Sequence, residues 1–282
     1  MEEDIVNTYI TNDLKNIGMS SIKIIRSLWG FRDHTYKEIP PVPLHPNEIV
    51  YVWGRENENM LKERGFETRY VQEETSPFAH EVLELIYERK LIALDLALKE
   101  FGEVIMLDWD CYVLRPFDKE FITELRKKPI QIPLYIQHED CYNALYESIP
   151  KEHPVFNNPD EHNQIENHLR IITKGFLKWH WKWENGLVSP NFGFVYSSDV
   201  TLGEKLTKIA VDNNIEGCVE EHATFLYADC TLEEYIKQYQ PTCTYGVSNR
   251  ALQNNSKVSK IQKKFNDYMD KQLNMDIYCE HI

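Results

Sequence analysis

Apolar residues over positions 1–112 alternate between short runs and longer stretches with helical spacing. Apolar, β-branched or aromatic residues dominate the short runs, which predict strands over Ser21–Trp29, Glu48–Trp53 and Thr68–Val71. A short helix is predicted over residues 56–65, where Gly65 occupies the position after the helix end. The pattern therefore indicates strands that alternate with helices.

The clearest periodicity lies between Ala79 and Phe101 and predicts a helix. Its apolar stripe consists of Leu83, Tyr87, Leu91, Leu94, Leu98 and Phe101. Gly102 ends it, and every residue of Val104–Leu107 is apolar, which is typical of a parallel strand covered on both faces. We therefore expect an α/β fold with a Rossmann-like, mostly parallel sheet, in which ligands bind beyond the carboxyl ends of the strands.

The second half of the chain has a weaker pattern. Residues 150–166 are polar, contain two prolines, and are interpreted as a loop or lid. A strand is predicted over Gly193–Ser197, and helices are predicted near residues 202–212, 220–228, 231–239 and 258–271.

Composition narrows the class of protein. The 282 residues are 42% hydrophobic and 12% aromatic, which is typical of a globular protein with a sizeable core. A net charge of -14, with acidic residues spread along the chain, argues against binding to nucleic acid or to anionic lipid. No 18-residue uncharged run occurs and Met1–Asp4 is acidic, so we expect neither a secretion signal nor a membrane-spanning segment.

The six cysteines are scattered, without a C-x-x-C pair or zinc-finger spacing. We interpret them as reduced thiols and expect a cytoplasmic location.

Asp108 and Asp110 follow the buried strand at positions i and i+2. In extended backbone, alternate side chains share a face, so these two carboxylates can converge on one point. Oxygen ligands of this kind select Mg²⁺ or Mn²⁺. Such a cation neutralises a diphosphate and acts as a Lewis acid on the leaving group.

The segment from Lys90–Leu94 through Glu103–Asp110 resembles the helix, strand and D-x-D motif of GT-A glycosyltransferases. The resemblance implies one GT-A-like domain over residues 1–282, with a nucleotide-sugar-binding half over about 1–112 and an acceptor-side half over about 113–282. It implies a UDP-linked hexose as donor, Mn²⁺ or Mg²⁺ as metal, and a glycan or other hydroxyl as acceptor. Asp110 would bind the metal directly, Asp108 would contact metal and ribose, and Trp109 would lie in the donor site.

Lys90 occupies a defined level on the predicted helix. From Phe101 back to Lys90 the helix covers about 16 Å, at about 1.5 Å per residue. From Glu103 to Asp108 the strand covers about 17 Å, at about 3.3 Å per residue. Because the helix runs antiparallel to the strand, Lys90 should lie level with Asp108. Its ammonium group would then contact a donor phosphate or the aspartates, or it would reach solvent instead.

The resemblance places the nucleoside at the ends of the first two predicted strands. Leu28, Trp29 and Gly30 end the first of these strands, and Trp53 ends the second. Core packing beside turn glycines is the alternative for each of them.

The acceptor side is expected in the second half. Trp179, Trp181 and Trp183 alternate with polar residues, so an extended chain would present three indoles on one side for a sugar, or would pack them in the core. Asn191 and Gly193 match an N-x-G-like stretch that lines the sugar pocket in GT-A enzymes.

Acidic residues at the predicted helix near 220–228 are candidates for catalysis. Glu220 and Glu221, or else Glu184, would serve an inverting enzyme as general base, whereas a retaining enzyme needs no base there. The helix dipole alone also favours acids in a first turn. GT-A enzymes often supply a histidine as third metal ligand, but Tyr245–Asn249 has none, which leaves the third ligand unassigned.

Two other functions fit parts of the pattern. A haloacid-dehalogenase-like phosphatase also has D-x-D after a buried strand, although Tyr112 stands where a Thr or Val is expected. A non-catalytic nucleotide-sugar binding module would share the fold and the donor site. Dinucleotide-binding and P-loop patterns are absent from the sequence. Donor sugar, acceptor, stereochemistry and oligomeric state are not predicted.

Overall fold

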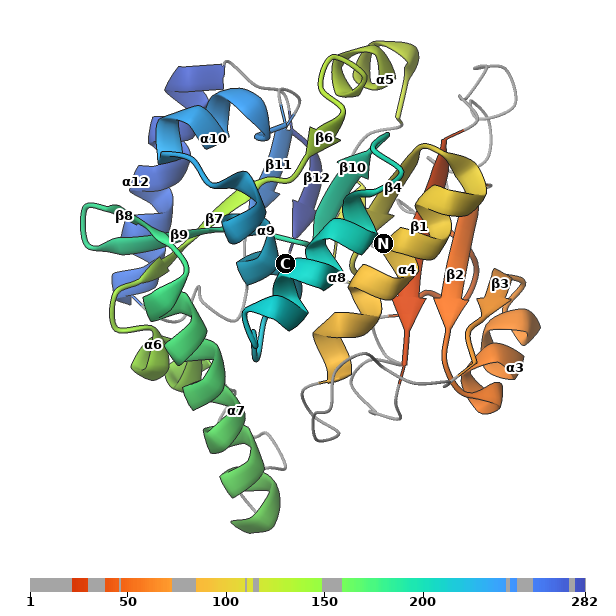
Figure 1. Ribbon diagram of the computed structural model, residues 1–282, viewed down its shortest axis with the longest axis horizontal. Coiled ribbons are helices and arrows are strands. Elements are labelled where there is room, and N and C mark those ends of the chain that lie inside the picture. Colours follow the sequence, from red (N-terminus) through yellow and green to blue (C-terminus); the bar gives the residue numbers. More distant parts are fainter. Residues whose placement is uncertain are drawn as a thin grey trace, which may run out of the picture.

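A computed structural model of the chain describes residues 22–29, 39–45, 47–72, 85–109, 111–113, 117–148, 159–241, 244–247, 256–273 and 277–281. Figure 1 shows the arrangement of its helices and strands.

The central sheet has six strands in the order β3-β2-β1-β4-β10-β6. They are β1 (Lys23–Leu28), β2 (Glu48–Val52), β3 (Glu67–Tyr70), β4 (Val104–Leu107), β6 (Ile130–Gln131) and β10 (Phe194–Ser197). The first four in the order pair in parallel, and β10 is antiparallel to both of its neighbours. The predicted α/β class with a mostly parallel sheet is confirmed, and the arrangement is consistent with a GT-A-like fold.

Strand β4 is buried on both faces, as its unbroken apolar run predicts. Val104 and Met106 belong to the core on one side of the sheet, and Ile105 and Leu107 to the core on the other side. None of the four is more than 1% exposed. Burial on both faces fixes the register of the strand, and therefore the position of Asp108, the residue that follows it.

Helices α4 (Leu85–Phe101) and α8 (Leu202–Asp212) pack together over one face of the sheet (Figure 1). Leu91, Leu94 and Leu98 form the stripe of α4 that is buried in the same core as Met106. Gly102 adopts a φ of 75° directly after α4, a left-handed conformation that glycine adopts without strain. The sequence periodicity therefore identifies the buried face and the end of this helix.

The described residues also form two smaller sheets. One has the antiparallel order β7-β9-β8, and the other has the order β11-β12-β5. Their strands are β5 (Cys111–Val113), β7 (Leu134–His138), β8 (Trp181–Trp183), β9 (Gly186–Pro190), β11 (Thr244–Val247) and β12 (Ile277–His281). The remaining described helices are α3 (Arg55–Glu63), α5 (Lys119–Leu125), α6 (Cys141–Ser148), α7 (Pro159–Lys178), α9 (Val219–Ala228), α10 (Leu232–Gln238) and α12 (Ser256–Leu273).

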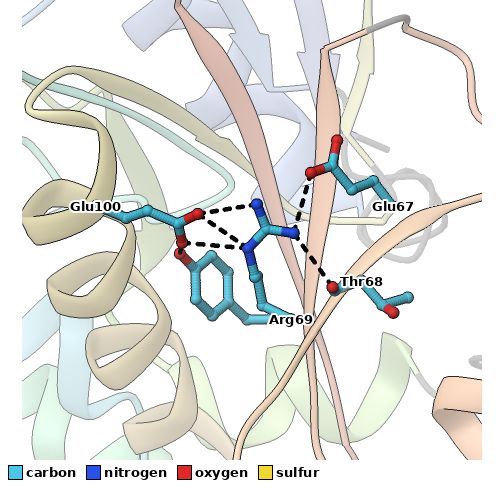
Figure 2. Close-up of polar contacts among 5 residues, drawn as sticks. Glu67, Thr68, Arg69 and Glu100 are labelled. Atoms are coloured by element: carbon cyan, nitrogen blue, oxygen red, sulfur yellow. Dashed lines mark hydrogen bonds and ion pairs between the residues drawn. The ribbon is translucent and has the colours of Figure 1, made fainter.

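An arginine joins the edge strand β3 to the end of α4, as Figure 2 shows. Arg69 donates from Nε and Nη2 to Oε1 of Glu100 at 2.9 and 2.8 Å, and its Nη1 lies 3.0 Å from Glu67. The hydroxyl of Tyr51 donates to the other oxygen of Glu100 at 2.8 Å. These bonds hold the carboxyl end of α4 against the sheet, ten residues beyond Lys90 in the sequence.

Two expectations about the second half are wrong. The polar segment 150–166 is not a loop throughout, because α7 begins at Pro159, and proline is favoured in the first turn of a helix. Residues 149–158 lie outside the described residues. Helix α7 extends away from the rest of the molecule in Figure 1. The three indoles do not share one side either, because Trp179 lies next to the end of α7 and only Trp181 and Trp183 lie on β8.

Among the described helices, none combines the length and the apolar character needed to cross a membrane.

The contact between α4 and α8 depends on a glycine. A Cβ atom at Gly203 would lie 2.5 Å from both the Cα and the backbone nitrogen of Asp95. We expect Gly203→Ala to separate the helices and to lower the free energy of unfolding by about 1–3 kcal/mol, as overpacking does elsewhere. Urea denaturation measures this change. Glu204→Ala, at the next and well-exposed position, is the control and should change stability by less than about 0.5 kcal/mol. Equal stability of the two variants would contradict the expectation.

Candidate functional site

Asp108 follows β4 directly and its backbone is held on both sides. Its N–H donates to the carbonyl of Gly193 at 3.0 Å, because β10 begins beside the end of β4. Its own carbonyl accepts from the N–H of Cys111 at 3.1 Å and from the guanidinium of Arg26. The Asp108 side chain is 17% exposed, so its carboxylate stands at the carboxyl end of the sheet with limited access to water.

Lys90 lies level with Asp108, as the lengths of the helix and the strand predict. Its Nζ atom is 2.6 Å from Oδ2 of Asp108, and the Lys90 side chain is 12% exposed. The alternative in which Lys90 only reaches solvent is therefore wrong.

Glu220 brings a second carboxylate to the same ammonium group. Nζ of Lys90 lies 3.3 Å from Oε1 of Glu220, whose side chain is 2% exposed. Glu220 belongs to the first turn of α9, where the helix dipole favours negative charge. Three elements, α4, β4 and α9, thus place one cation between two carboxylates.

The cluster extends to Asn191 and Gly193 in the β9–β10 connection and to Glu221 on α9. The side-chain oxygen of Asn191 accepts from the N–H of Gly193 at 3.0 Å, and Nδ2 of Asn191 is 3.5 Å from Oε1 of Glu221. Asn191 is 5% exposed and Glu221 is 9% exposed. Six residues predicted for the site are therefore connected through hydrogen bonds and ion pairs, namely Lys90, Asp108, Asn191, Gly193, Glu220 and Glu221.

Burial changes the acidity of both glutamates. Loss of hydration raises the pKa of Glu220 to about 7, although Lys90 acts in the opposite direction. Burial also raises the pKa of Glu221 well above its ordinary value, and the neighbouring charge of Glu220 adds to this effect. A carboxyl group with a pKa near neutrality can accept a proton under physiological conditions.

The residues predicted for the nucleoside lie at the carboxyl edge of β1 and β2. Leu28 and Trp53 are buried, which agrees with the core-packing alternative for their side chains. Trp29 is partly buried and its ring meets that of Trp53 edge to face at 6.3 Å. The guanidinium of Arg89 lies 5.6 Å from the centre of the Trp53 ring. Gly30 lies outside the described residues.

Trp109 is anchored below the Asp108 turn. Its indole N–H donates to the carbonyl of Ser27 at 2.8 Å, and its ring meets Phe66 edge to face at 5.9 Å. The guanidinium of Arg26 lies 5.0 Å from the ring centre. Sequence reasoning did not identify Arg26; a charged residue in the middle of an isoleucine-rich strand was the available signal.

The donor atoms suit a hard divalent cation. Carboxylate oxygens from Asp108 and Glu220 already surround a positive charge, and oxygen is the ligand that Mg²⁺ and Mn²⁺ prefer. Asp110, the other predicted ligand, and Asn249 lie outside the described residues. Within the described part of the chain, no three His, Cys, Asp or Glu side chains form a metal site by themselves.

Glu184 and two of the predicted acceptor-side indoles have other partners. Oε2 of Glu184 lies 3.1 Å from Nζ of Lys264, and both side chains are largely exposed. Trp181 packs on Phe225 and Tyr235, with ring centres 4.6 and 4.9 Å apart. Trp183 packs on Phe265 and Tyr268. These tryptophans therefore contribute to a core, as the second interpretation of their pattern predicts.

Comparison with known proteins gives similar structures without a similar sequence. No family model matches the chain, and no curated protein matches it. Mouse xyloside xylosyltransferase 1 in its apo form has a TM-score of 0.45 at 11% identity, over 93% of this chain and 97% of that one.

Two further solved structures are similar to the chain, each at 11% identity. A glycosyltransferase involved in glycosylation of the major capsid of PBCV-1 has a TM-score of 0.33, over 92% of both chains. The bifunctional glycosyltransferase WbbM has a TM-score of 0.40, over 96% of this chain and 47% of that one. All three of these proteins are glycosyltransferases. At 11% identity and these TM-scores, a function for the present chain is argued from the geometry of its own site.

His222 on α9, the helix that carries Glu220 and Glu221, makes the free energy of unfolding depend on pH. His222 is fully buried against Phe176 and Trp179, and burial lowers its pKa to about 3. The unfolded chain binds this proton near pH 6.5, so unfolding takes up a proton between about pH 6.5 and 3. This contribution to the free energy of unfolding is complete above pH 6.5 and is lost as the pH falls, by about 1.4 kcal/mol per pH unit.

We expect His222→Phe, which keeps a ring in the same space, to flatten this acid-side decline. Urea denaturation of both proteins between pH 7 and pH 4.5 measures the slopes, and other titrating groups cancel in the comparison. Parallel stability curves for the two proteins would show that His222 does not bind the proton.

Proposed function

We propose that the chain is a glycosyltransferase that moves a hexose from a nucleoside-diphosphate sugar, UDP-linked, to an acceptor hydroxyl. The observation that carries this proposal is the placement of Lys90 between Asp108 and Glu220 at the carboxyl end of a mostly parallel sheet. Ligands of such sheets bind at this edge. A cation between acidic groups, next to a strand end, suits a substrate whose diphosphate must be held and then released.

On the donor side, Lys90 and Asp108 have complementary tasks. In this proposal Asp108 and Asp110 hold Mn²⁺ or Mg²⁺, which supplies Lewis-acid stabilisation of the departing diphosphate. The ammonium group of Lys90, which has two carboxylate partners here, can turn toward a phosphate oxygen. The fixed backbone of Asp108 keeps its carboxylate at the sheet edge while these partners exchange.

On the acceptor side, the buried glutamates supply a base. Burial raises the pKa of Glu220 to about 7, so at neutral pH a substantial share of this residue is a carboxylate that can accept the proton of an acceptor hydroxyl. Glu221, whose pKa burial raises well above its ordinary value, is the second candidate and would accept that proton only after losing its own. Asn191 positions Glu221 through its side-chain amide. In this scheme an inverting reaction uses one of the two glutamates directly.

The donor site is tested by calorimetric titration with UDP and GDP, with and without Mn²⁺. We expect Asp108→Asn to reduce Mn²⁺-dependent UDP affinity by about 100-fold or more, because a charged metal ligand is lost. Asp212→Asn, at an exposed position on α8, is the matched control and should bind as the wild type does.

Normal metal-dependent UDP binding by Asp108→Asn would refute the assignment of the metal site. Absence of binding of both nucleotides to the wild type would refute the proposed donor, and a phosphatase assay would then follow. Binding of UDP without sugar transfer would identify a non-catalytic module.

The base is identified by comparing Glu220→Gln with Glu221→Gln. If one of these glutamates deprotonates the acceptor hydroxyl, its replacement by glutamine should lower kcat by about 10²–10⁴-fold. The UDP affinity of that variant should stay close to that of the wild type. Steady-state transfer rates and calorimetry on the same samples measure both quantities. Wild-type kcat in both variants would exclude a general base on α9.

A further inference from the structure

A buried ion pair lies beneath the turn that carries Asp108. Nε of Arg26 donates to Oε1 of Glu48, and neither residue is more than 3% exposed. Glu48 begins β2, and its other oxygen accepts from the N–H groups of Leu44 and His45 at 3.0 and 3.3 Å. Both ends of the pair are therefore fixed, one on β1 and the other on the turn before β2.

The free end of the guanidinium points to the candidate site. Nη1 of Arg26 donates to the carbonyl oxygen of Asp108, and the guanidinium plane lies near the ring of Trp109. Trp109 donates back to Ser27, the residue after Arg26. Strand β1 and the Asp108 turn thus hold each other through two hydrogen bonds in opposite directions.

Stability alone is a weak reason for this arrangement. Removing two charges from water costs free energy that a buried pair regains only in part, and apolar residues of similar volume often stabilise such a position equally well. The neighbours of Arg26 on its own face of β1 are apolar, namely the buried residues Ile24 and Leu28. What an apolar pair cannot provide is a donor for the carbonyl of Asp108.

We propose that Arg26, held by Glu48, is a positioning residue that fixes the Asp108–Trp109 turn for binding of the donor diphosphate and its metal. This role rests on the proposed glycosyltransferase function. Arg26 acts through the backbone of Asp108 and through Trp109, and it does not contact the substrate. Carboxylates that are fixed before binding lose less freedom when a cation arrives, so affinity rises.

The test uses a double variant, Arg26→Met with Glu48→Gln. It removes both charges together, so that no unpaired charge stays buried, and it keeps an oxygen acceptor for Leu44 and His45. Hydrogen exchange at the Asp108 amide and the Trp109 indole N–H is measured by NMR, beside the thermal unfolding midpoint. Calorimetry with UDP and Mn²⁺ is performed on the same samples.

We expect exchange at both groups to rise about tenfold or more, and Mn²⁺-dependent UDP affinity to fall about tenfold, as for loss of one charge-assisted hydrogen bond. Arg69→Met is the control, because it removes another arginine–glutamate pair at the sheet, a more exposed one whose hydrogen bonds do not involve Asp108 (Figure 2). It should leave both measurements unchanged.

Unchanged exchange in a folded double variant would overturn the proposal, and so would unchanged UDP affinity despite faster exchange. If the double variant does not fold, Arg26→Lys replaces it: one ammonium group cannot serve Glu48 and Asp108 together, so the same losses are expected. If wild-type protein binds neither UDP nor GDP, the proposed function fails, whereas the exchange measurement still decides whether Arg26 fixes the turn.

Discussion

The structure around the candidate site depends on one charge balance, the ammonium group of Lys90 between the carboxylates of Asp108 and Glu220. Each of these three side chains is at most 17% exposed, and an unpaired charge with so little water around it would be costly. Lys90 lies on α4, Asp108 follows β4 and Glu220 lies on α9, so pairing these charges requires the three elements to meet at the carboxyl end of the sheet. The requirement therefore joins the first half of the chain to the second.

The remaining parts of the site follow from the way β10 enters the sheet. It pairs antiparallel with β4, opposite Phe194 to Leu107, so the residues just before β10 lie beside the residue just after β4. This brings Gly193 to the backbone of Asp108 and Asn191 to Glu221. If β10 were a fifth parallel strand, it would begin at the amino ends of its neighbours, and the residues before it would lie far from Asp108.

Charge within the site differs from charge over the whole molecule. The chain carries a net charge of -14, which would repel a diphosphate at long range. At short range, Lys90 supplies positive charge beside Asp108 and Glu220, and burial favours the neutral form of Glu221. A site that neutralises its own acids in this way can accept an anionic ligand in an acidic protein.

The sequence by itself determined the local features of this protein. The stripe of α4, the fully apolar run of β4 and the positions of Gly65 and Gly102 predict the strand–helix order, because side-chain periodicity and backbone sterics act over a few residues. Fixed rises per residue even placed Lys90 level with Asp108.

Only the tertiary structure decided which distant residues meet. No local pattern shows that Glu220 approaches Lys90, that Arg26 reaches the carbonyl of Asp108, or that Trp181 and Trp183 pack in a core. The polar segment at the start of α7 also forms a helix that its composition did not predict. These contacts join segments up to 130 residues apart in the sequence, the distance between Lys90 and Glu220. They arise from strand pairing and from the burial of charge. Both act between elements, so neither leaves a periodic pattern in the sequence of a single element.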